Sequence, residues 1–202
     1  MAITKPLLLI GCGGHARSLI ELVESTSQWK ICGLVGLPGE VGGRVLGYPI
    51  IGTDSDLPNL RSYCPSAVLA VGQLPAPASR KILAGLLNKY AFDLPVLISP
   101  HAVVSSSAKI GCGTTVGHGA VVNAAADVGA HCILNTCSLI EHDVKIRDYC
   151  HISTGALVNG GVHLGSGSFI GSGAIIREGL RLPAHTIISS GKRVMGWPLK
   201  DT

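Results

Sequence analysis

A hydrophobic residue recurs at every sixth position from Ile98 to Val194. Each of these positions is Ile, Val or Leu, and no insertion interrupts the count. The residue two places earlier is mostly small or β-branched, as at Ala108 and Thr114, and glycine often follows, as at Gly111. A repeat of six residues is typical of a parallel β-helix. The short strands of a β-sandwich, the alternative interpretation, do not keep one register over so long a segment.

The repeat predicts a specific packing. The aliphatic residue of each short strand points inward, the chain turns a corner, and three repeats close one triangular coil. Coils stack at the strand spacing of about 4.8 Å, so that residues three repeats apart form continuous buried columns. Gly and Asn at the corners are expected to supply backbone angles that other residues resist. Each coil is stabilised only by its neighbours.

Before the repeats, short apolar runs alternate with helical periodicity, which predicts a small parallel α/β unit. The expected strands span residues 7–10, 29–35 and 67–71, and the expected helices span 16–24 and 80–90. Loops are expected at 36–53, with a brief extended piece at 48–51, and at 72–77. Ser79 is expected to cap the second helix, whose inward side chains would be Ile82, Leu83, Leu86 and Leu87. We therefore expect a Rossmann-like α/β domain at 1–95 and a β-helix at 96–202, ending in a short tail that begins near residue 193.

Composition narrows the function classes. Of 202 residues, 47% are hydrophobic but only 4% are aromatic, which suits a narrow β-helix core. The net charge of +4 comes without a Lys/Arg cluster interleaved with aromatics, so a nucleic-acid partner is not expected. No apolar run is long enough to span a membrane. The seven cysteines lack CxxC pairs, and Cys132 and Cys150 occupy small inward positions, which indicates reduced thiols in a cytoplasmic protein.

The glycine-rich turn after the first expected strand is a candidate phosphate site, because backbone N–H groups at a helix start bind phosphate. Gly11-x-Gly13-x-x-Ala16 fits a loose dinucleotide fingerprint. A nicotinamide cofactor would need a carboxylate at the end of the second strand, where residues 33–36 have none. A nucleotide-sugar diphosphate is the favoured ligand, and a tight turn without a ligand remains the alternative.

Among the histidines of the repeats, His142 has a distinctive context. It follows the inward Ile140, and Glu141 and Asp143 flank it. Gly160, one coil further along, has no side chain to crowd it. A carboxylate beside an imidazole orients the ring and raises its basicity, as a general base requires.

Several motifs together resemble one enzyme family. These are residues 135–143, His151, residues 159–162, the turn at 11–15, the segment 72–80 and the closing 196–198. They resemble the left-handed β-helix acyltransferases, and more narrowly the PglD/NeuD-like sugar acetyltransferases. The likeness covers nearly the whole chain. It implies a homotrimer with sites between neighbouring β-helices, acetyl-CoA as co-substrate, no metal, and a nucleotide-sugar substrate used in bacterial polysaccharide or glycan biosynthesis.

The resemblance also implies roles for individual residues. His142 matches the catalytic base and Asp143 the acidic residue that tunes it. The coenzyme would contact His151, Gly160, Ser172 and Ser190. The substrate would contact Gly11, Gly13, Gly14, His15 and Asn135. Relatives commonly carry an Asp pair after the second strand, and this chain has Val35 and Gly36 there, so the nucleotide and the sugar stay open.

We expect direct acetyl transfer to the amino group of a 4-amino-sugar nucleotide, because a base and a positioned amine suffice for attack on a thioester. O-acetylation of sialic acid or another sugar is the first alternative, and a Cys137 nucleophile is an alternative mechanism. A zinc enzyme on the same scaffold would need clustered histidines, and His118 and His142 fall on different faces. A binding protein without catalysis is the remaining class.

Overall fold

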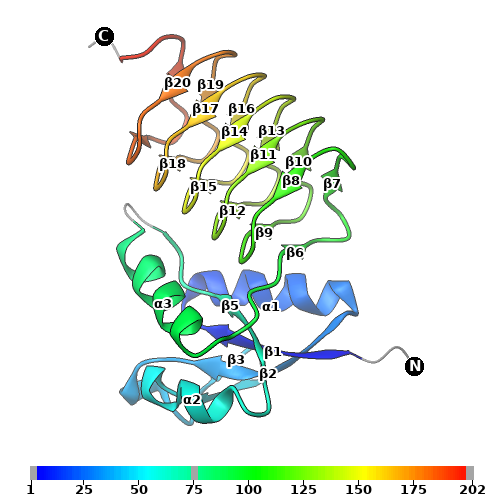
Figure 1. Cartoon of the computed structure of the whole chain (residues 1–202), viewed down its shortest axis with the longest axis vertical. Coiled ribbons are helices and arrows are strands. Elements are labelled where there is room, and N and C mark those ends of the chain that lie inside the picture. The colour runs from blue at the N-terminus through cyan, green and yellow to red at the C-terminus, as the bar shows by residue number, and fades with distance from the viewer. Residues whose placement is uncertain (1–3, 74–76, 199–202) are drawn as a thin grey trace. The chain divides into compact units, whose positions relative to one another are not determined.

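The computed structural model describes residues 4–73 and 77–198. The chain divides into two compact units, the first made of residues 1–72 and 78–97 and the second of residues 73–77 and 98–202. Residues 74–76 of the expected loop and residues 199–202 of the expected tail lie outside the described residues. Figure 1 shows both units and labels most of their helices and strands.

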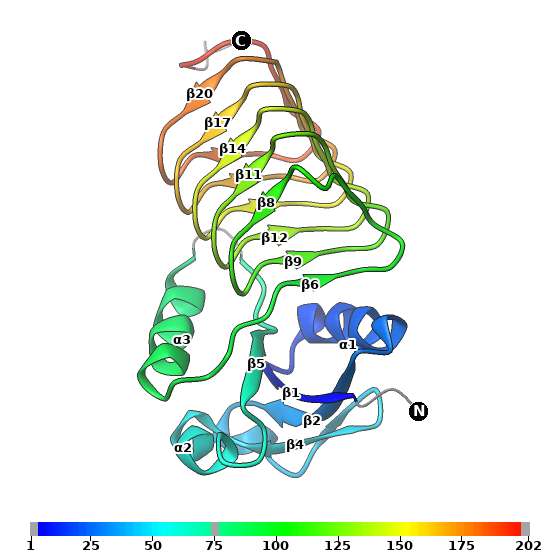
Figure 2. The same ribbon diagram turned by 45° about the vertical axis from the view of Figure 1, so that its right-hand side comes forward.

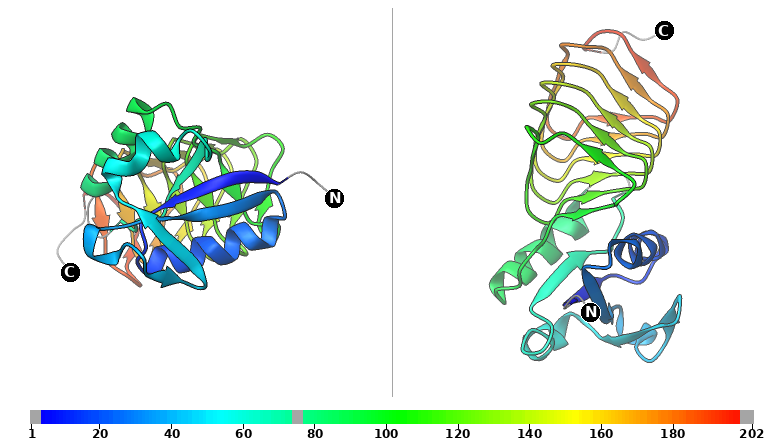
Figure 3. Two further views of the ribbon diagram at one scale, coloured as in Figure 1. Left: turned by 90° about the horizontal axis from the view of Figure 1, so that it is seen from below. Right: turned by 90° about the vertical axis from the view of Figure 1, so that its right-hand side faces the viewer.

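The first unit is a mostly parallel sheet with helices on its two faces (Figure 3). Its strands are β1 (Lys5–Ile10), β2 (Trp29–Val35), β3 (Arg44–Val45), β4 (Tyr48–Gly52) and β5 (Ser66–Leu69), in the spatial order β3-β4-β2-β1-β5. Only β3 is antiparallel to its neighbour. The helices are α1 (Gly14–Thr26), α2 (Leu57–Leu60) and α3 (Ala78–Lys89), with 3-10 turns at Pro38–Glu40 and Asp54–Asp56. This confirms the predicted α/β class.

Strand β1 is central because residues 7–10 are apolar on both faces, and all four are buried. Leu7 and Leu9 pack in one cluster with Ile20 of α1. The chain runs from β1 to β2 on one side and later returns to β5 on the other side of β1. Such a change of direction opens a crevice at the carboxyl ends of the strands, where ligands of this fold class bind.

The buried face of α3 differs from the prediction. Arg80, Ala84 and Leu87 are buried, and Ile82 is 70% exposed, so the expectation that Ile82 points inward is wrong. The physical reason is that Arg80 takes the inward position, where its Nη1 donates to the carbonyls of Leu69 and Val71 at 3.2 and 2.6 Å. Ile82 is two residues further along the helix and therefore faces the other way. Ser79 lies within the first turn of α3 rather than before it.

The second unit is a left-handed parallel β-helix of three sheets (Figure 2). The first sheet contains β6 (Leu97–Ile98), β9 (Thr115–Val116), β12 (Ile133–Leu134), β15 (His151–Ile152), β18 (Phe169–Ile170) and β21 (Ile187–Ile188). The second contains β7 (Val103–Val104), β10 (Val121–Val122), β13 (Leu139–Ile140), β16 (Leu157–Val158), β19 (Ile175–Ile176) and β22 (Arg193–Val194). The third contains β8 (Lys109–Ile110), β11 (Asp127–Val128), β14 (Lys145–Ile146), β17 (His163–Leu164) and β20 (Arg181–Leu182).

The register confirms the predicted stacking. Val122 pairs with Ile140, and Ile140 pairs with Val158, so each coil contains three six-residue repeats. The repeat aliphatics from Val116 to Val194 are buried in one cluster. Ile98 is 38% exposed, because the first coil has a β-helix neighbour on one side only.

The turns between the sheets set the site geometry. We call the turns after the first sheet the first corner (residues 135–138 and their equivalents three repeats apart) and those after the second sheet the second corner (residues 141–144 and their equivalents). From Gly113 to Gly191, each turn has a left-handed residue three positions after the aliphatic one, as at Gly161 with φ 66°. The glycine directly after the aliphatic residue serves another purpose, because a Cβ on Gly111 would lie 2.6 Å from the backbone nitrogen of Ala130.

Candidate functional site

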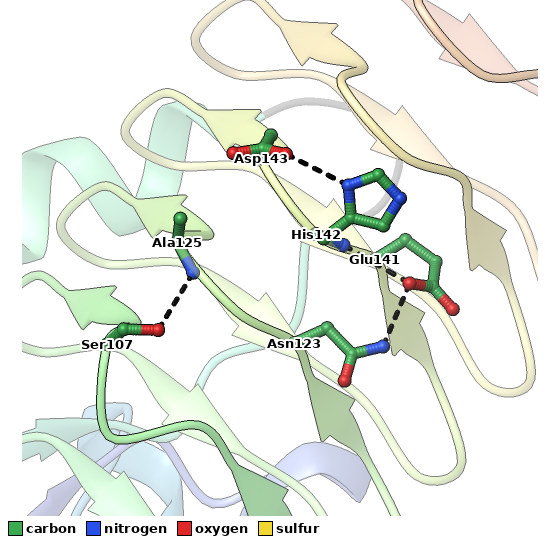
Figure 4. Close-up of polar contacts among 6 residues, drawn as sticks. All are labelled: Ser107, Asn123, Ala125, Glu141, His142 and Asp143. Atoms are coloured by element: carbon green, nitrogen blue, oxygen red, sulfur yellow. Dashed lines mark hydrogen bonds and ion pairs between the residues drawn. The ribbon is translucent and has the colours of Figure 1, made fainter.

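His142 and Asp143 lie together on the second corner, with the side chains 65% and 67% exposed. His142 Nδ1 is 2.9 Å from Asp143 Oδ2 (Figure 4). A carboxylate only accepts hydrogen bonds, so Nδ1 carries the proton and Nε2 is left as the basic nitrogen. The hydrogen bond to Asp143, with the negative charges of Asp143 and Glu141, raises the pKa of His142 despite slight desolvation.

The turn explains why this carboxylate meets the ring. Asp143 occupies the left-handed position with φ 60°, a conformation that Asp tolerates better than most residues. Its backbone N–H donates to the carbonyl of Ala124 at 3.0 Å, which ties the turn to the preceding coil. The backbone therefore fixes the direction in which Asp143 leaves the corner.

Glu141 supports the backbone beneath the ring. Its Oε2 accepts hydrogen bonds from Nδ2 of Asn123 at 2.9 Å and from the backbone N–H of His142 at 3.2 Å (Figure 4). Sequence reasoning named Glu141 only as a neighbour and missed Asn123. The signal was available, because Asn123 stands three repeats before Glu141.

Gly160 leaves the space beside the ring that the sequence led us to expect. A Cβ at this position would lie 2.7 Å from both Nε2 and Cε1 of His142. The basic nitrogen therefore faces a place where only glycine fits without movement of the ring. A coenzyme groove at Gly160 stays a prediction.

A second group of predicted residues lies along the first sheet and first corner. Asn135 Nδ2 is 3.5 Å from Nε2 of His151. His151 is 7% exposed, its Nδ1 donates to the carbonyl of Gln73 at 3.1 Å, and its ring meets Phe169 edge-on at 5.2 Å. These contacts hold the imidazole in one orientation.

Ser172 and Ser190 continue this side of the β-helix. Ser172 lies 2.9 Å from Ser153, oxygen to oxygen, and Ser190 is exposed one coil further along. The structure thus places the predicted residues in two groups: His142, Asp143 and Gly160 at the second corner, and Asn135, His151, Ser172 and Ser190 on the first sheet and corner. Within one chain the two groups occupy different corners of the triangular coil.

The first unit contains a cavity of about 430 Å³ at the carboxyl ends of β1, β2 and β5. Gly11 and Gly13 line it, whereas the predicted Gly14 and His15 begin α1 and are not part of its wall. Gly11 has φ 116° and an added Cβ would lie 2.6 Å from Val71, so glycine is required there. The cavity wall also contains residues that sequence reasoning missed, namely Cys12, Leu37, Glu40, Asp54 and Ile82.

The structure also bears on the two alternatives of a zinc enzyme and a Cys137 nucleophile. His118 lies on the first corner and His142 on the second, as the sequence indicated, and no group of metal-binding side chains is found among residues 4–73 and 77–198. Cys137 is an exposed thiol at a left-handed position of the first corner. In the described part of the chain, no helix is both long and apolar enough to cross a membrane.

Comparisons with known proteins agree with this architecture. The sequence model of the PglD N-terminal domain matches residues 6–83. Among curated protein sequences, none matches the chain. A histidine-to-asparagine variant of perosamine N-acetyltransferase from Caulobacter crescentus, solved with CoA and GDP-perosamine, is 31% identical with a TM-score of 0.89. That alignment covers 96% of this chain and 90% of the other.

Two further structures are similar. The acetyltransferase domain of PglB from Neisseria gonorrhoeae, in complex with acetyl coenzyme A, is 32% identical with a TM-score of 0.84, over 95% of this chain and 93% of the other. WeeI from Acinetobacter baumannii is 22% identical with a TM-score of 0.75, over 98% and 99% of the two chains, and it supports the fold alone.

Proposed function

This chain belongs to the PglD-like family of sugar acetyltransferases, and we propose on that basis that it transfers the acetyl group of acetyl-CoA to a nucleotide-linked 4-amino sugar. The observation that carries the proposal is the His142–Asp143 pair facing the gap at Gly160. The similar Caulobacter enzyme was solved with CoA and GDP-perosamine, which supports this pair of substrates.

The chemistry follows from the state of His142. The sugar amine attacks the thioester carbonyl and forms a C–N bond, and Nε2 takes the proton that the nitrogen loses. Collapse of the tetrahedral intermediate breaks the C–S bond, and the imidazolium returns the proton to the sulfur of CoA. Asp143 stabilises the imidazolium and holds Nδ1–H in place. No acyl-enzyme is needed, because the base and the positioned amine suffice.

A homotrimer with sites between chains is part of the proposal. It is supported by the separation of the two residue groups onto different corners, since a second copy would bring its first sheet to the second corner of the first copy. The outward residues of the second sheet from β7 to β19 are also apolar: Val103, Val121, Leu139, Leu157 and Ile175. The outward residue of the last strand, β22, is Arg193. Those of the third sheet are polar: Lys109, Asp127, Lys145, His163 and Arg181.

The first unit would hold the nucleotide, with the diphosphate at the turn of Gly11 and Gly13, where the cavity meets the start of α1. Since acetyl-CoA and nucleotide sugars are made in the cytoplasm, we place the reaction there, as a step in the biosynthesis of bacterial polysaccharide or another glycan.

The deciding experiment measures CoA release from acetyl-CoA with a panel of UDP-, GDP- and dTDP-amino sugars, and with the hydroxyl analogues of the same sugars. We expect release with at least one amino sugar, and a loss of at least about 100-fold in kcat for His142→Ala with the coenzyme still bound. If only the hydroxyl analogues are acetylated, the protein is an O-acetyltransferase and not an N-acetyltransferase. Near-normal activity of His142→Ala would overturn the assignment of the base.

A further inference from the structure

A carboxylate reaches the cavity of the first unit from a turn that follows β2. Glu40 lines the cavity, and its Oε2 accepts hydrogen bonds from the Leu37 backbone N–H at 2.8 Å and the Cys12 thiol at 2.9 Å. Both contacts use Oε2, so among the described residues Oε1 remains available to a ligand. Residues 33–36, where a dinucleotide-binding domain would carry its acidic residue, contain no carboxylate.

The position of Glu40 is built by its neighbours. A Cβ on Gly36 would lie 2.8 Å from Cys12 Sγ and 3.0 Å from Glu40 Oε2, so glycine at this position admits both side chains. Burial, with the hydrogen bond and negative charge of Glu40, raises the pKa of the Cys12 thiol to about 11, and the thiol stays a donor. Its hydrogen bond lowers the pKa of Glu40, which is ionised at neutral pH.

Two exposed apolar side chains stand at the same cavity. Leu37 and Ile82 are each 70% exposed, and both line the cavity. Leu37 follows β2 and Ile82 belongs to α3, which follows β5, so they approach from the two sides of β1. Exposed apolar side chains gathered at a cavity mark a ligand surface, and a planar base presents two apolar faces.

We propose that Glu40 Oε1 accepts hydrogen bonds from the ribose hydroxyls of the nucleotide and that Leu37 and Ile82 pack against its base. The Glu40 carboxylate thereby binds the ribose hydroxyls, as the acidic residue at the end of the second strand does in dinucleotide-binding domains. The inference rests on the proposed function and names the part of the substrate that this cavity recognises. If Glu40 only caps its own turn, ligand affinity will not depend on its charge.

The first experiment compares GDP with 2′-deoxy-GDP, and UDP with 2′-deoxy-UDP, by calorimetry. The unmodified protein is expected to bind the better ribonucleotide at least about 10-fold more tightly than its deoxy form, because a hydrogen bond to a charged group is lost. Glu40→Gln keeps an acceptor for Leu37 and is expected to bind both forms equally weakly. Glu21→Gln, on the exposed side of α1, is the matched control and should keep the discrimination. Equal affinities in the unmodified protein would overturn the role of Glu40, as would full discrimination by Glu40→Gln.

The second experiment tests the apolar contacts. Leu37→Ala and Ile82→Ala are each expected to weaken binding of the same nucleotide about 10-fold through lost contact area, with unchanged thermal unfolding. Val41→Ala, an exposed apolar position outside the cavity wall, is the control. Unchanged affinity in both variants would show that the base does not pack against Leu37 and Ile82.

The two proposals can fail separately. If the unmodified protein acetylates a nucleotide amino sugar while Glu40→Gln, Leu37→Ala and Ile82→Ala keep its KM, only the present inference fails. If the unmodified protein neither binds these nucleotides nor releases CoA with any amino sugar, the proposed function fails first.

Discussion

Gly160 lies one coil further along the β-helix than His142, and its α-carbon is next to the imidazole ring. Only the lack of a side chain at Gly160 leaves room for that ring. The nearest atoms to an added Cβ would be Nε2 and Cε1 of His142, both at 2.7 Å. This distance is well inside van der Waals contact, so a methyl group there must push the ring aside.

Gly160→Ala is therefore expected to lower kcat by about 10- to 100-fold, because a displacement near 1 Å of a catalytic group has effects of that size. The fold should persist, since Gly160 lacks the left-handed backbone angle. Steady-state kinetics and thermal unfolding provide the test. Gly85→Ala, where an added Cβ meets nothing within 4 Å, is the matched control. Equal kcat in both variants would show that the ring does not need this space.

Asp143→Asn should change the pH dependence as well as the rate. The Asp143 carboxylate raises the pKa of His142, and a general base works only when neutral, so activity rises as pH increases through that pKa. Removing the charge lowers the pKa and moves the acid limb of kcat/KM to lower pH, while the plateau falls because the base is weaker. Profiles of kcat/KM against pH for both proteins test this, and an unshifted limb would contradict the pairing.

The apolar outer face of the second sheet should be buried between copies. Leu157→Lys places a charge among the apolar outward residues and is expected to convert a trimer to smaller species and abolish activity together. Asp127→Lys, on the polar third sheet, should change neither. Sedimentation equilibrium measures the mass. A trimeric Leu157→Lys protein would place the interface elsewhere.

The buried guanidinium of α3 should contribute to stability. Arg80→Met leaves the carbonyls of Leu69 and Val71 without these donors, and an expected loss of about 2–4 kcal/mol follows for the first unit. Urea unfolding followed by tryptophan fluorescence of Trp29, which belongs to this unit, is the measurement. Arg17→Met on the exposed side of α1 serves as the control. A change below about 0.5 kcal/mol in Arg80→Met would show that water replaces the guanidinium at little cost.

The sequence predicted the β-helix in more detail than the α/β unit, and the reason is physical. In the β-helix, the repeat fixes both which side chains are inside and which residues are stacked, so Val122, Ile140 and Val158 could be aligned by counting. The same counting placed Gly160 beside His142. In the α/β unit, the apolar pattern of α3 was outweighed by the hydrogen bonds of Arg80, and Ile82 faces outward.

The cavity residues were harder to foresee. Glu40 is the last residue of a 3-10 turn and its side chain reaches back to Cys12, a contact between residues far apart in the chain that no periodicity encodes. The glycines were noticed as a class, but two uses were merged. Those directly after the aliphatic residue permit close backbone approach, and the left-handed angle falls two residues later, where Asp143 also stands.

That last position has an evolutionary consequence. From Gly113 to Gly191, each turn of the β-helix has an equivalent left-handed position, so a histidine followed by an acidic residue could be placed at any of these turns. Residues 160 and 161 are both glycine, and the same dipeptide placed there would carry its imidazole about 4.8 Å further along the axis. A protein built on this scaffold can thus move the imidazole along the β-helix axis in steps of one coil while every coil keeps its backbone.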